Sequence, residues 1–291
     1  MKIILFSRPL AFAHKEQIVQ IFAAIERYGF DYAVNCEVAD DIEKFIERTI
    51  TPEKRYSQSI GIHDGEAVMV CYGGDGTLLE GVHRLCGENI PVVGINSGRL
   101  GFLALAQSGE IDEVFEQIAS HALRIEQRSM IEVTGEFEGS QQSVYALNEV
   151  AVQRLGATMI SVDIMVDNMP TLTCNGDGVI ISTPTGSTAY SLSAGGPIVA
   201  PSCHSFLLTP LAPHNLTMRP IVMPDTSIVE LRISTRRSAS SVSVDDRTFE
   251  VANDAVLTIK KAKRYIRLAV PHNISFFDSL RNKMMWGVDI R

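Results

Sequence analysis

Residues 73–77 read Gly-Gly-Asp-Gly-Thr and directly follow an apolar run at residues 67–72. The run is typical of a buried strand. The apolar residues after the motif recur at helical spacing, so the motif predicts a turn between a strand and a helix. The three glycines let this turn approach a ligand closely, and the first N–H groups of a helix form an anion site. We therefore expect a phosphate site built from Gly73, Gly74, Gly76 and Thr77.

Asp75 is the unusual member of this turn, because a carboxylate repels phosphate. Such a carboxylate is useful when it orients a hydroxyl and accepts its proton as the phosphate arrives. The alternative role is structural, since Asp is common as a helix cap.

A second group of small polar residues lies further along the chain. Residues 175–178 read Asn-Gly-Asp-Gly, and after an apolar strand residues 183–191 read Thr-Pro-Thr-Gly-Ser-Thr-Ala-Tyr-Ser. Hydroxyls and glycines at this density do not build a core, but they supply N–H groups and short donors around a polar ligand. The second group therefore favours a ligand site over a merely structural turn.

These motifs closely resemble those of the NAD kinase family when they are taken with Asn148-Glu149 and with Asn-Ser-Gly-Arg-Leu-Gly-Phe at residues 96–102. The resemblance covers most of the chain in the family's order. It implies a bacterial-type kinase that transfers the γ-phosphoryl of ATP to the 2′-hydroxyl of the adenosine ribose of NAD, giving NADP, with Mg²⁺ accompanying ATP. The sequence has no P-loop motif and no dinucleotide fingerprint after its first strand.

Two other functions stay open at this point. Diacylglycerol and sphingosine kinases share the first motif, but a lipid kinase would need an apolar patch or a membrane-seeking helix. A non-catalytic dinucleotide sensor would gain nothing from the carboxylate of Asp75. The sequence does not distinguish ATP from polyphosphate as donor, or NAD from NADH as acceptor.

The resemblance also implies roles for individual residues. Asp75 is the proton acceptor, Asn148 and Glu149 bind ribose or adenine, and Asp177 binds the nicotinamide end of the dinucleotide, with its site shared across a subunit boundary. The predicted NAD-binding residues are Asp75, Gly76, Phe102, Asn148, Glu149, Asn175, Asp177, Thr188, Ala189, Tyr190, Ser193 and Arg247.

Each of these assignments has a structural alternative. Tyr190 and Phe102 would serve equally as core aromatics, and Asp177 as the side chain of an Asx turn. Arg247, in the charged turn that follows Asp245, would serve as an ordinary surface residue. Asn148 and Glu149 would form an exposed pair at a strand end, although their apolar neighbours predict at least partial burial.

The order of the predicted elements indicates two fold classes in one chain. Strands and helices alternate at residues 1–122, which predicts an α/β domain whose mostly parallel sheet has helices on both faces. Alternating apolar and polar residues predict an all-β sandwich at residues 123–271, and we expect residues 272–291 to return to the first domain. Within the first domain, we expect Asp40-Asp41 to cap a helix that continues through Ile46, and residues 51–64 to form a loop.

Composition limits the partners. A net charge of −8 over 291 residues argues against nucleic acid, and no apolar run is long enough for a membrane helix. Five cysteines without a Cys-x-x-Cys motif, and histidines without ligand spacing, predict no metal site made by the protein alone and a cytoplasmic location. We expect a homotetramer or homodimer, because the edge strands of a sandwich need cover.

Overall fold

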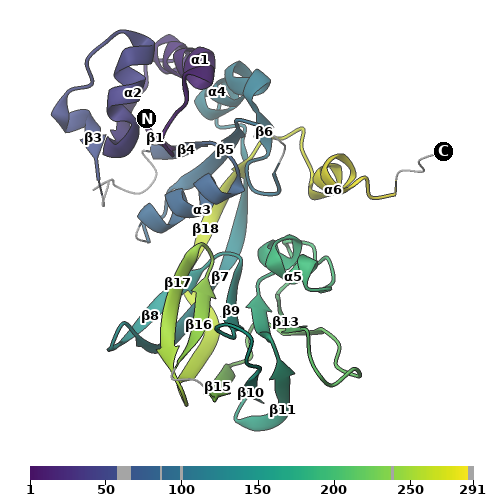
Figure 1. The fold of residues 1–291 in the computed structure, drawn as a ribbon. Coiled ribbons are helices and arrows are strands. Elements are labelled where there is room, and N and C mark those ends of the chain that lie inside the picture. The colour runs from purple at the N-terminus through teal and green to yellow at the C-terminus, as the bar shows by residue number, and fades with distance from the viewer. Residues whose placement is uncertain (58–66, 86, 99–100, 237–238, 288–291) are drawn as a thin grey trace. The chain divides into compact units, whose positions relative to one another are not determined.

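The computed structural model of the chain (Figure 1) describes residues 1–57, 67–85, 87–98, 101–236 and 239–287. The chain divides into two compact units. Unit 1 comprises Met1–Gln127 and Ile266–Arg291, and unit 2 comprises Arg128–Tyr265.

Unit 1 is built on a parallel sheet. Its strands lie in the order β5 (Pro91–Asn96), β4 (Ala67–Tyr72), β1 (Lys2–Ser7), β2 (Asp31–Asn35) and β3 (Arg55–Tyr56). Two further strands, β6 (Ala106–Gln107) and the C-terminal part of β18 (Val256–Val270), pair in parallel with β5. Strand β4 is buried along its whole length, and β5 is buried from Val92 onward, because both faces of the sheet are covered.

Helices cover the two faces of this sheet. One face packs against α1 (Lys15–Arg27), α2 (Cys36–Ile46) and α4 (Ile111–Ala119), and the other against α3 (Asp75–Arg84) (Figure 1). Helix α3 lies very close to the sheet, because a Cβ at Gly81 would lie 2.7 Å from the sulfur of Cys71 on β4. The short 3₁₀ helices are η1 (Phe12–His14), η2 (Pro52–Lys54) and η3 (Ser108–Glu110). The α/β prediction is confirmed.

Two local expectations in unit 1 were wrong. Asp40 and Asp41 do not cap α2 but lie inside it, because the helix begins at Cys36, directly after β2. Asn35 stands at the cap position, yet its side chain bonds the backbone N–H and carbonyl of Ser7 and so ties β2 to β1. The expected loop at residues 51–64 contains η2 and β3, where Arg55 pairs with Asp40, whereas residues 58–64 lie outside the described residues.

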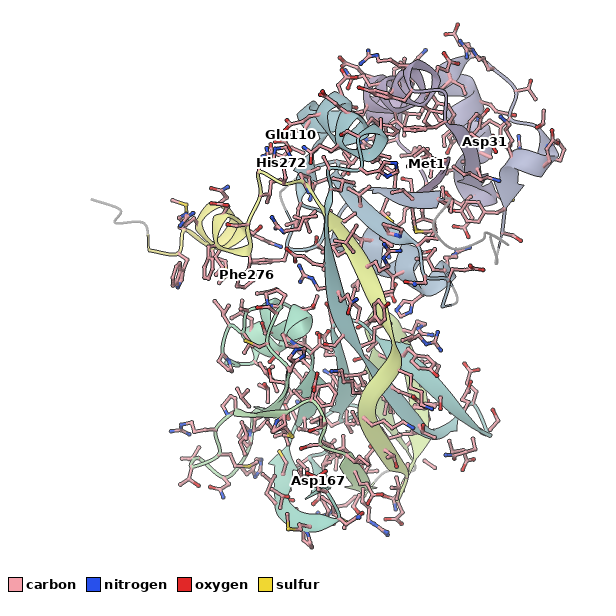
Figure 2. The ribbon with its side chains drawn as sticks, turned by 180° about the vertical axis from the view of Figure 1, so that it is seen from behind. Met1, Asp31, Glu110, Asp167, His272 and Phe276 are labelled. Carbon is pink, nitrogen blue, oxygen red and sulfur yellow. The ribbon has the colours of Figure 1, made fainter. Side chains whose placement is uncertain are left out.

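The last element of the chain belongs to unit 1. Helix α6 (Phe276–Met284) begins with a capping box in which Ser275 and Asp278 exchange hydrogen bonds. Before it, the N–H of His272 donates to the side chain of Gln117 on α4, and Figure 2 labels His272 and Phe276 on this segment. No helix in the described part of the chain has both the length and the apolar content needed to cross a membrane.

Unit 2 consists of two antiparallel arrays of strands. The first array has the order β11 (Met169–Gly176), β10 (Ile160–Val166), β15 (Val229–Thr235) and β18, with β18 paired to β7 (Arg124–Phe137) and β7 to β8 (Ser140–Ala146). The second has the order β14 (Ile221–Pro224), β13 (Ser205–Leu211), β12 (Gly178–Ser182), β9 (Glu149–Gln153), β16 (Ala239–Val244) and β17 (Arg247–Ala252).

The two arrays share one core. Val162 on β10 and Ile181 on β12 are both fully buried in it, whereas Asp163, on the opposite side of β10, is exposed. This alternation is what a strand with one buried face requires, and the prediction of an all-β sandwich is confirmed. Helical structure in this unit consists of η4 (Thr185–Thr188) and α5 (Tyr190–Ser193), as far as the structure describes it.

Candidate functional site

The strand order of unit 1 marks one position as a ligand site. The connection from β1 to β2 runs through α1 on one face, and the connection from β4 to β5 runs through α3 on the other. Ligands of open α/β sheets bind outside the carboxyl ends of the two strands where the winding reverses. Here those strands are β1 and β4, which end next to Arg8 and the Gly73–Thr77 turn.

The turn after β4 has a tightly constrained backbone. The N–H of Gly73 donates to the carbonyl of Ile95 on β5 at 2.9 Å. A Cβ at Gly73 would lie 2.4 Å from the hydroxyl oxygen of Thr77, so only glycine fits there. Gly74 occupies the cap position of α3, and Asp75 is its first helical residue. The predicted phosphate-binding residues therefore form the N-terminal turn of α3.

The carboxylate of Asp75 does not cap its own helix. It accepts backbone N–H groups from Phe102 (2.8 Å, to Oδ2), Leu103 (3.0 Å, to Oδ1) and Ala104 (2.9 Å, to Oδ1). A carboxylate oxygen can accept about two hydrogen bonds. Among the described residues, Oδ1 is thus saturated and Oδ2 retains one acceptor position.

The segment after β5 is shaped around this carboxylate. A Cβ at Gly101 would lie 1.8 Å from Oδ1 of Asp75, so the close approach depends on a glycine. At the start of the segment, the side chain of Asn96 accepts the N–H of Gly98 at 2.7 Å. Arg99 and Leu100 of the same predicted motif lie outside the described residues.

Two cations that the sequence analysis missed stand against this turn. The guanidinium of Arg8 donates to the carbonyl of Gly76 (3.2 Å) and to Glu80 (2.8 Å). The ammonium of Lys283 on α6 lies 3.6 Å from Oδ2 of Asp75 and 4.5 Å from the ring centroid of Phe102. A basic residue directly after the first strand was a usable signal for Arg8. Nothing in the sequence singled out Lys283.

A second aspartate, in unit 2, also accepts three successive backbone N–H groups. Asp245 accepts the N–H groups of Leu147 (2.7 Å), Asn148 (2.8 Å) and Glu149 (3.1 Å). The sequence analysis treated Asp245 only as part of a charged turn. Its left-handed backbone, with φ of 53°, is a feature of the folded chain. Asp245 therefore fixes the backbone of the predicted Asn148-Glu149 pair.

Asn148 and Glu149 are buried, each with 8% of its surface exposed. Burial, with a smaller contribution from the charge of Asp245, raises the pKa of Glu149 from its usual 4.5 to about 8. Its Oε2 atom has no hydrogen-bond partner among the described residues. A buried polar atom of this kind needs a partner, which a bound ligand can supply.

The raised pKa of Glu149 predicts a pH-dependent stability. Between about pH 4.5 and 8 the folded state keeps a proton that the unfolded state loses, so the unfolding free energy falls as pH rises through this window. The maximum slope is about 1.4 kcal/mol per pH unit. Glu149→Gln removes the titration, so we expect its stability to rise relative to that of the wild type between these pH values. Urea unfolding across the window measures the difference.

The control for this experiment is Glu136→Gln, because Glu136 is an exposed residue of the same unit. Its stability difference from the wild type should stay constant over the window. A constant difference for Glu149→Gln as well would show that Glu149 does not retain its proton on folding.

The predicted adenosine-site residues gather beside Asn148 and Glu149. A Cβ at Gly186 in η4 would lie 2.2 Å from the carbonyl oxygen of Asn148, which places η4 against this pair. The backbone N–H of Tyr190 bonds the carboxyl of Glu149, and its hydroxyl accepts from Gln153 at 2.8 Å.

The remaining polar candidates are found in the same unit. Thr188 donates its hydroxyl to the carbonyl of Thr185 at 3.3 Å. Ala189 is partly buried and Ser193 is exposed. Arg247 is half-buried, and its guanidinium donates to the carbonyl of Tyr145 at 2.8 Å. Burial lowers the pKa of Arg247.

Asp177 and Asn175 lie elsewhere in unit 2. The chain passes from β11 to β12 at Asp177, whose carboxylate pairs with Arg154. In the paired strands β9 and β12, Glu149 lies opposite Ser182 at one end, and Gln153 lies opposite Gly178 at the other. Asp177 lies one residue beyond Gly178 and is thus roughly 17 Å, five residues, from Glu149 along the strand direction. Asn175 is exposed, and its carbonyl accepts the N–H of His214.

The structure therefore groups the predicted residues into three sets. Asp75, Gly76 and Phe102 meet at the α3 turn of unit 1. The residues around Asn148 and Glu149 meet in unit 2, and Asp177 with Asn175 lie at the far end of β9 and β12. Within the described ranges, no three His, Cys, Asp or Glu side chains converge in a way that could hold a metal ion.

Comparisons with known proteins match both units. Residues 36–123 match the family model of the ATP-NAD kinase N-terminal domain, and residues 147–270 match that of the ATP-NAD kinase C-terminal domain. A curated NAD kinase from Bacteroides fragilis is 34% identical over 292 residues, with 100% of each chain covered. One from Porphyromonas gingivalis is 41% identical over 224 residues, with 77% of each covered.

Solved structures give the same result. The yeast NADH kinase complexed with NADH superposes with a TM-score of 0.87 at 25% identity, over 100% of this chain and 89% of that chain. An NAD kinase from Archaeoglobus fulgidus in complex with ATP has a TM-score of 0.72 at 24% identity, over 99% and 98% of the two chains. The second likeness shows a shared fold.

Proposed function

Because this chain belongs to the NAD kinase family, we propose that Asp75 accepts the proton of the NAD 2′-hydroxyl during phosphoryl transfer. The enzyme phosphorylates NAD to NADP with ATP, as the primary interpretation of the sequence predicted. The lipid-kinase and sensor alternatives gain no support from these similarities.

The observation that carries the role of Asp75 is the acceptor position left on Oδ2. Three backbone N–H groups hold the carboxylate still at the switch point of the sheet. A hydroxyl bound at Oδ2 is aligned for attack on the γ-phosphorus of ATP. The bond from the 2′-oxygen to phosphorus forms as the bond to the bridging oxygen breaks, ADP leaves with the electron pair, and Asp75 takes the proton. Positioning supplies more of the rate than proton removal does in such a transfer.

The phosphates of ATP need local positive charge, because the chain as a whole is acidic. We assign them to the N-terminal turn of α3, formed by Gly73, Gly74, Gly76 and Thr77, where helix N–H groups favour anions. The guanidinium of Arg8, which contacts the carbonyl of Gly76, adds a cation at the same place.

We assign the adenosine of NAD to the residues around Asn148 and Glu149. The raised pKa keeps Glu149 protonated at neutral pH, so it can donate a hydrogen bond to an acceptor on the ligand. Thr188, Ala189, Tyr190 and Ser193 line the neighbouring turn. Arg247 supports this segment through the carbonyl of Tyr145.

The test of this assignment is a coupled assay. Purified protein is incubated with Mg-ATP and NAD, and NADP is measured with a dehydrogenase specific for NADP. An NAD analogue that lacks the 2′-hydroxyl of the adenosine ribose should bind and inhibit without being phosphorylated. Phosphorylation of that analogue would exclude the proposed acceptor. Parallel reactions with polyphosphate and with NADH identify the donor and acceptor preferences.

We propose that Mg²⁺ reaches the site with ATP and not through a cage of protein ligands. Mg²⁺ in kinases is held mainly by substrate phosphates, with one or two carboxylates added. We expect calorimetry to detect stoichiometric Mg²⁺ binding to this protein only when a non-hydrolysable ATP analogue is present. Tight binding to the protein alone would contradict this.

We propose that the active unit is a homotetramer or homodimer in which Asp177 serves the site of a neighbouring chain. Asp177 lies too far from Glu149 for one adenosine to contact both, so unit 2 holds a second ligand-type cluster beyond what one adenosine needs, and the family resemblance implies that such a site is shared. The edge strand β14 also exposes Ile221 and Val222, at 42% and 51% of their surfaces. Exposed apolar edges are ordinarily covered by a partner.

Subunit mixing tests the shared site. Asp75→Asn and Asp177→Ala chains should each be inactive as homo-oligomers. When the two are dissociated and reassembled together, we expect activity to return, because some sites then combine an intact Asp75 with an intact Asp177 from the other chain. Separately reassembled homo-oligomers are the control. Full activity from a protein that sediments as a monomer would exclude a shared site.

We also place the enzyme in the cytoplasm. The cysteines that the structure describes, Cys36, Cys71, Cys174 and Cys203, are free thiols, as is usual in a reducing compartment.

A further inference from the structure

Helix α6 presents one face to the Asp75 site. Phe276, Leu280 and Lys283 are spaced i, i+4 and i+7, which places them on the same side of a helix. Leu280 is 3% exposed, and the ring of Phe276 lies 6.5 Å from that of Phe102. Figure 2 shows Phe276 at the start of this helix. The C-terminal helix is therefore docked on unit 1 by an apolar contact that brings Lys283 to the site.

The ammonium of Lys283 is held by two groups of the site. It lies 3.6 Å from Oδ2 of Asp75, the oxygen that retains an acceptor position, and 4.5 Å from the ring centroid of Phe102. Phe102 also donates its N–H to the same oxygen. The cation thus lies beside the oxygen to which the attacking hydroxyl would bind.

Stability alone does not explain this placement. The side chains of Lys283 and Asp75 are 37% and 28% exposed, and an ion pair at that exposure contributes little to stability. Ordering a long lysine side chain costs conformational entropy that offsets this small gain. The arrangement does solve an electrostatic problem, because a γ-phosphoryl that approaches Asp75 meets a negative charge. A fixed ammonium within 4 Å of that carboxylate offsets the repulsion.

We propose that Lys283 is a positioning residue for phosphoryl transfer, which holds the Asp75 carboxylate and supplies the positive charge beside Oδ2. This proposal rests on the role proposed above for Asp75. It makes the C-terminal helix a functional part of the kinase site, delivered to that site by Phe276 and Leu280.

The experiment compares Lys283→Met, Lys283→Arg and Arg281→Met. Lys283→Met keeps the apolar stem and removes the charge. Lys283→Gln is a second neutral variant in case an exposed Met lowers solubility. Arg281→Met is the matched control, because it also removes a positive charge from α6. Arg281 is two residues from Lys283 and pairs with Asp278 on the same helix.

We expect Lys283→Met to lower kcat on the order of 10²-fold, the loss typical of one positioned charge, while the KM for NAD and the melting temperature stay close to those of the wild type. Lys283→Arg should recover most of the lost kcat, and Arg281→Met should leave kcat unchanged. If Lys283 only anchored α6, Lys283→Met would instead lower the melting temperature and leave kcat within about threefold. That result would overturn the proposal.

A double-mutant cycle with Asp75→Asn separates the proposed role of Lys283 from the proposed role of Asp75. If Lys283 acts through Asp75, adding Lys283→Met to Asp75→Asn should cause little further loss, whereas independent effects would multiply. Independent effects would exclude action through Asp75. An inactive Asp75→Asn with a fully active Lys283→Met would refute only the role of Lys283, and an active Asp75→Asn would refute both.

Discussion

Replacing Asp75 by Asn is expected to lower kcat by about 10²–10⁴-fold, the usual cost of losing a general base. The substitution keeps the size of the side chain and removes its charge and its ability to take a proton. The amide oxygen can still accept the N–H groups of Leu103 and Ala104, so the fold should persist. Steady-state kinetics of NADP formation, together with NAD binding by calorimetry, measure the two effects separately.

Asp245→Asn is the matched control for this variant. Asp245 makes the same kind of cap on three successive N–H groups, but in unit 2 and around Asn148. Placing an amide donor against one of those N–H groups should cost about 1–3 kcal/mol of stability and raise the KM for NAD, with a smaller effect on kcat. If Asp75→Asn lowers kcat by less than tenfold at unchanged NAD affinity, Asp75 is not the proton acceptor.

Replacing Gly101 by Ala is expected to inactivate the enzyme without unfolding it. The new Cβ would lie 1.8 Å from Oδ1 of Asp75 and 2.6 Å from its Cγ, whereas non-bonded atoms need about 3.5 Å. The carboxylate must therefore leave its position and lose backbone partners. A misplacement of about 1 Å in a reacting group can reduce the rate by about 10²-fold, and we expect a loss in kcat of at least that order.

Gly98→Ala is the control for steric change in the same segment. A Cβ at Gly98 would meet no atom of the described residues within 4 Å, so this variant should keep the kcat and melting temperature of the wild type. The effect of Gly101→Ala should come from the clash with the carboxylate of Asp75. Wild-type kcat in Gly101→Ala would show that the position of the Asp75 carboxylate does not matter for turnover.

The local sequence pattern was sufficient to predict the secondary-structure elements that carry the Asp75 site. The apolar run of β4, the glycines after it and the helical spacing behind them predicted a strand, a turn and a helix, and the structure has all three in place. Local pattern failed at the start of α2. There Asn35 uses its side chain to join two parallel strands, and a pairing between residues 28 positions apart leaves no mark on the local sequence.

For the same reason, the hydrogen-bond partners of the carboxylates of Asp75 and Asp245 could not be predicted from the sequence. Asp75 reads locally as a possible helix cap, but the folded sheet brings Phe102 to it from 27 residues away. Asp245 reads as part of a turn, and its partner Asn148 is 97 residues away. A short-range motif specifies which residue types occur together. It does not specify which distant N–H groups will point at them.

The sequence by itself determined the fold classes through hydrophobic periodicity. Its motifs of neighbouring residues carried the resemblance that implied the family and the reaction. Only the tertiary structure decided that Asp75 faces the Phe102 segment, that Glu149 is buried enough to keep its proton, and that Lys283 stands beside Oδ2. Burial and long-range contacts depend on how strands are ordered and helices docked. Those properties arise from the packing of the whole unit and not from any one segment of the chain.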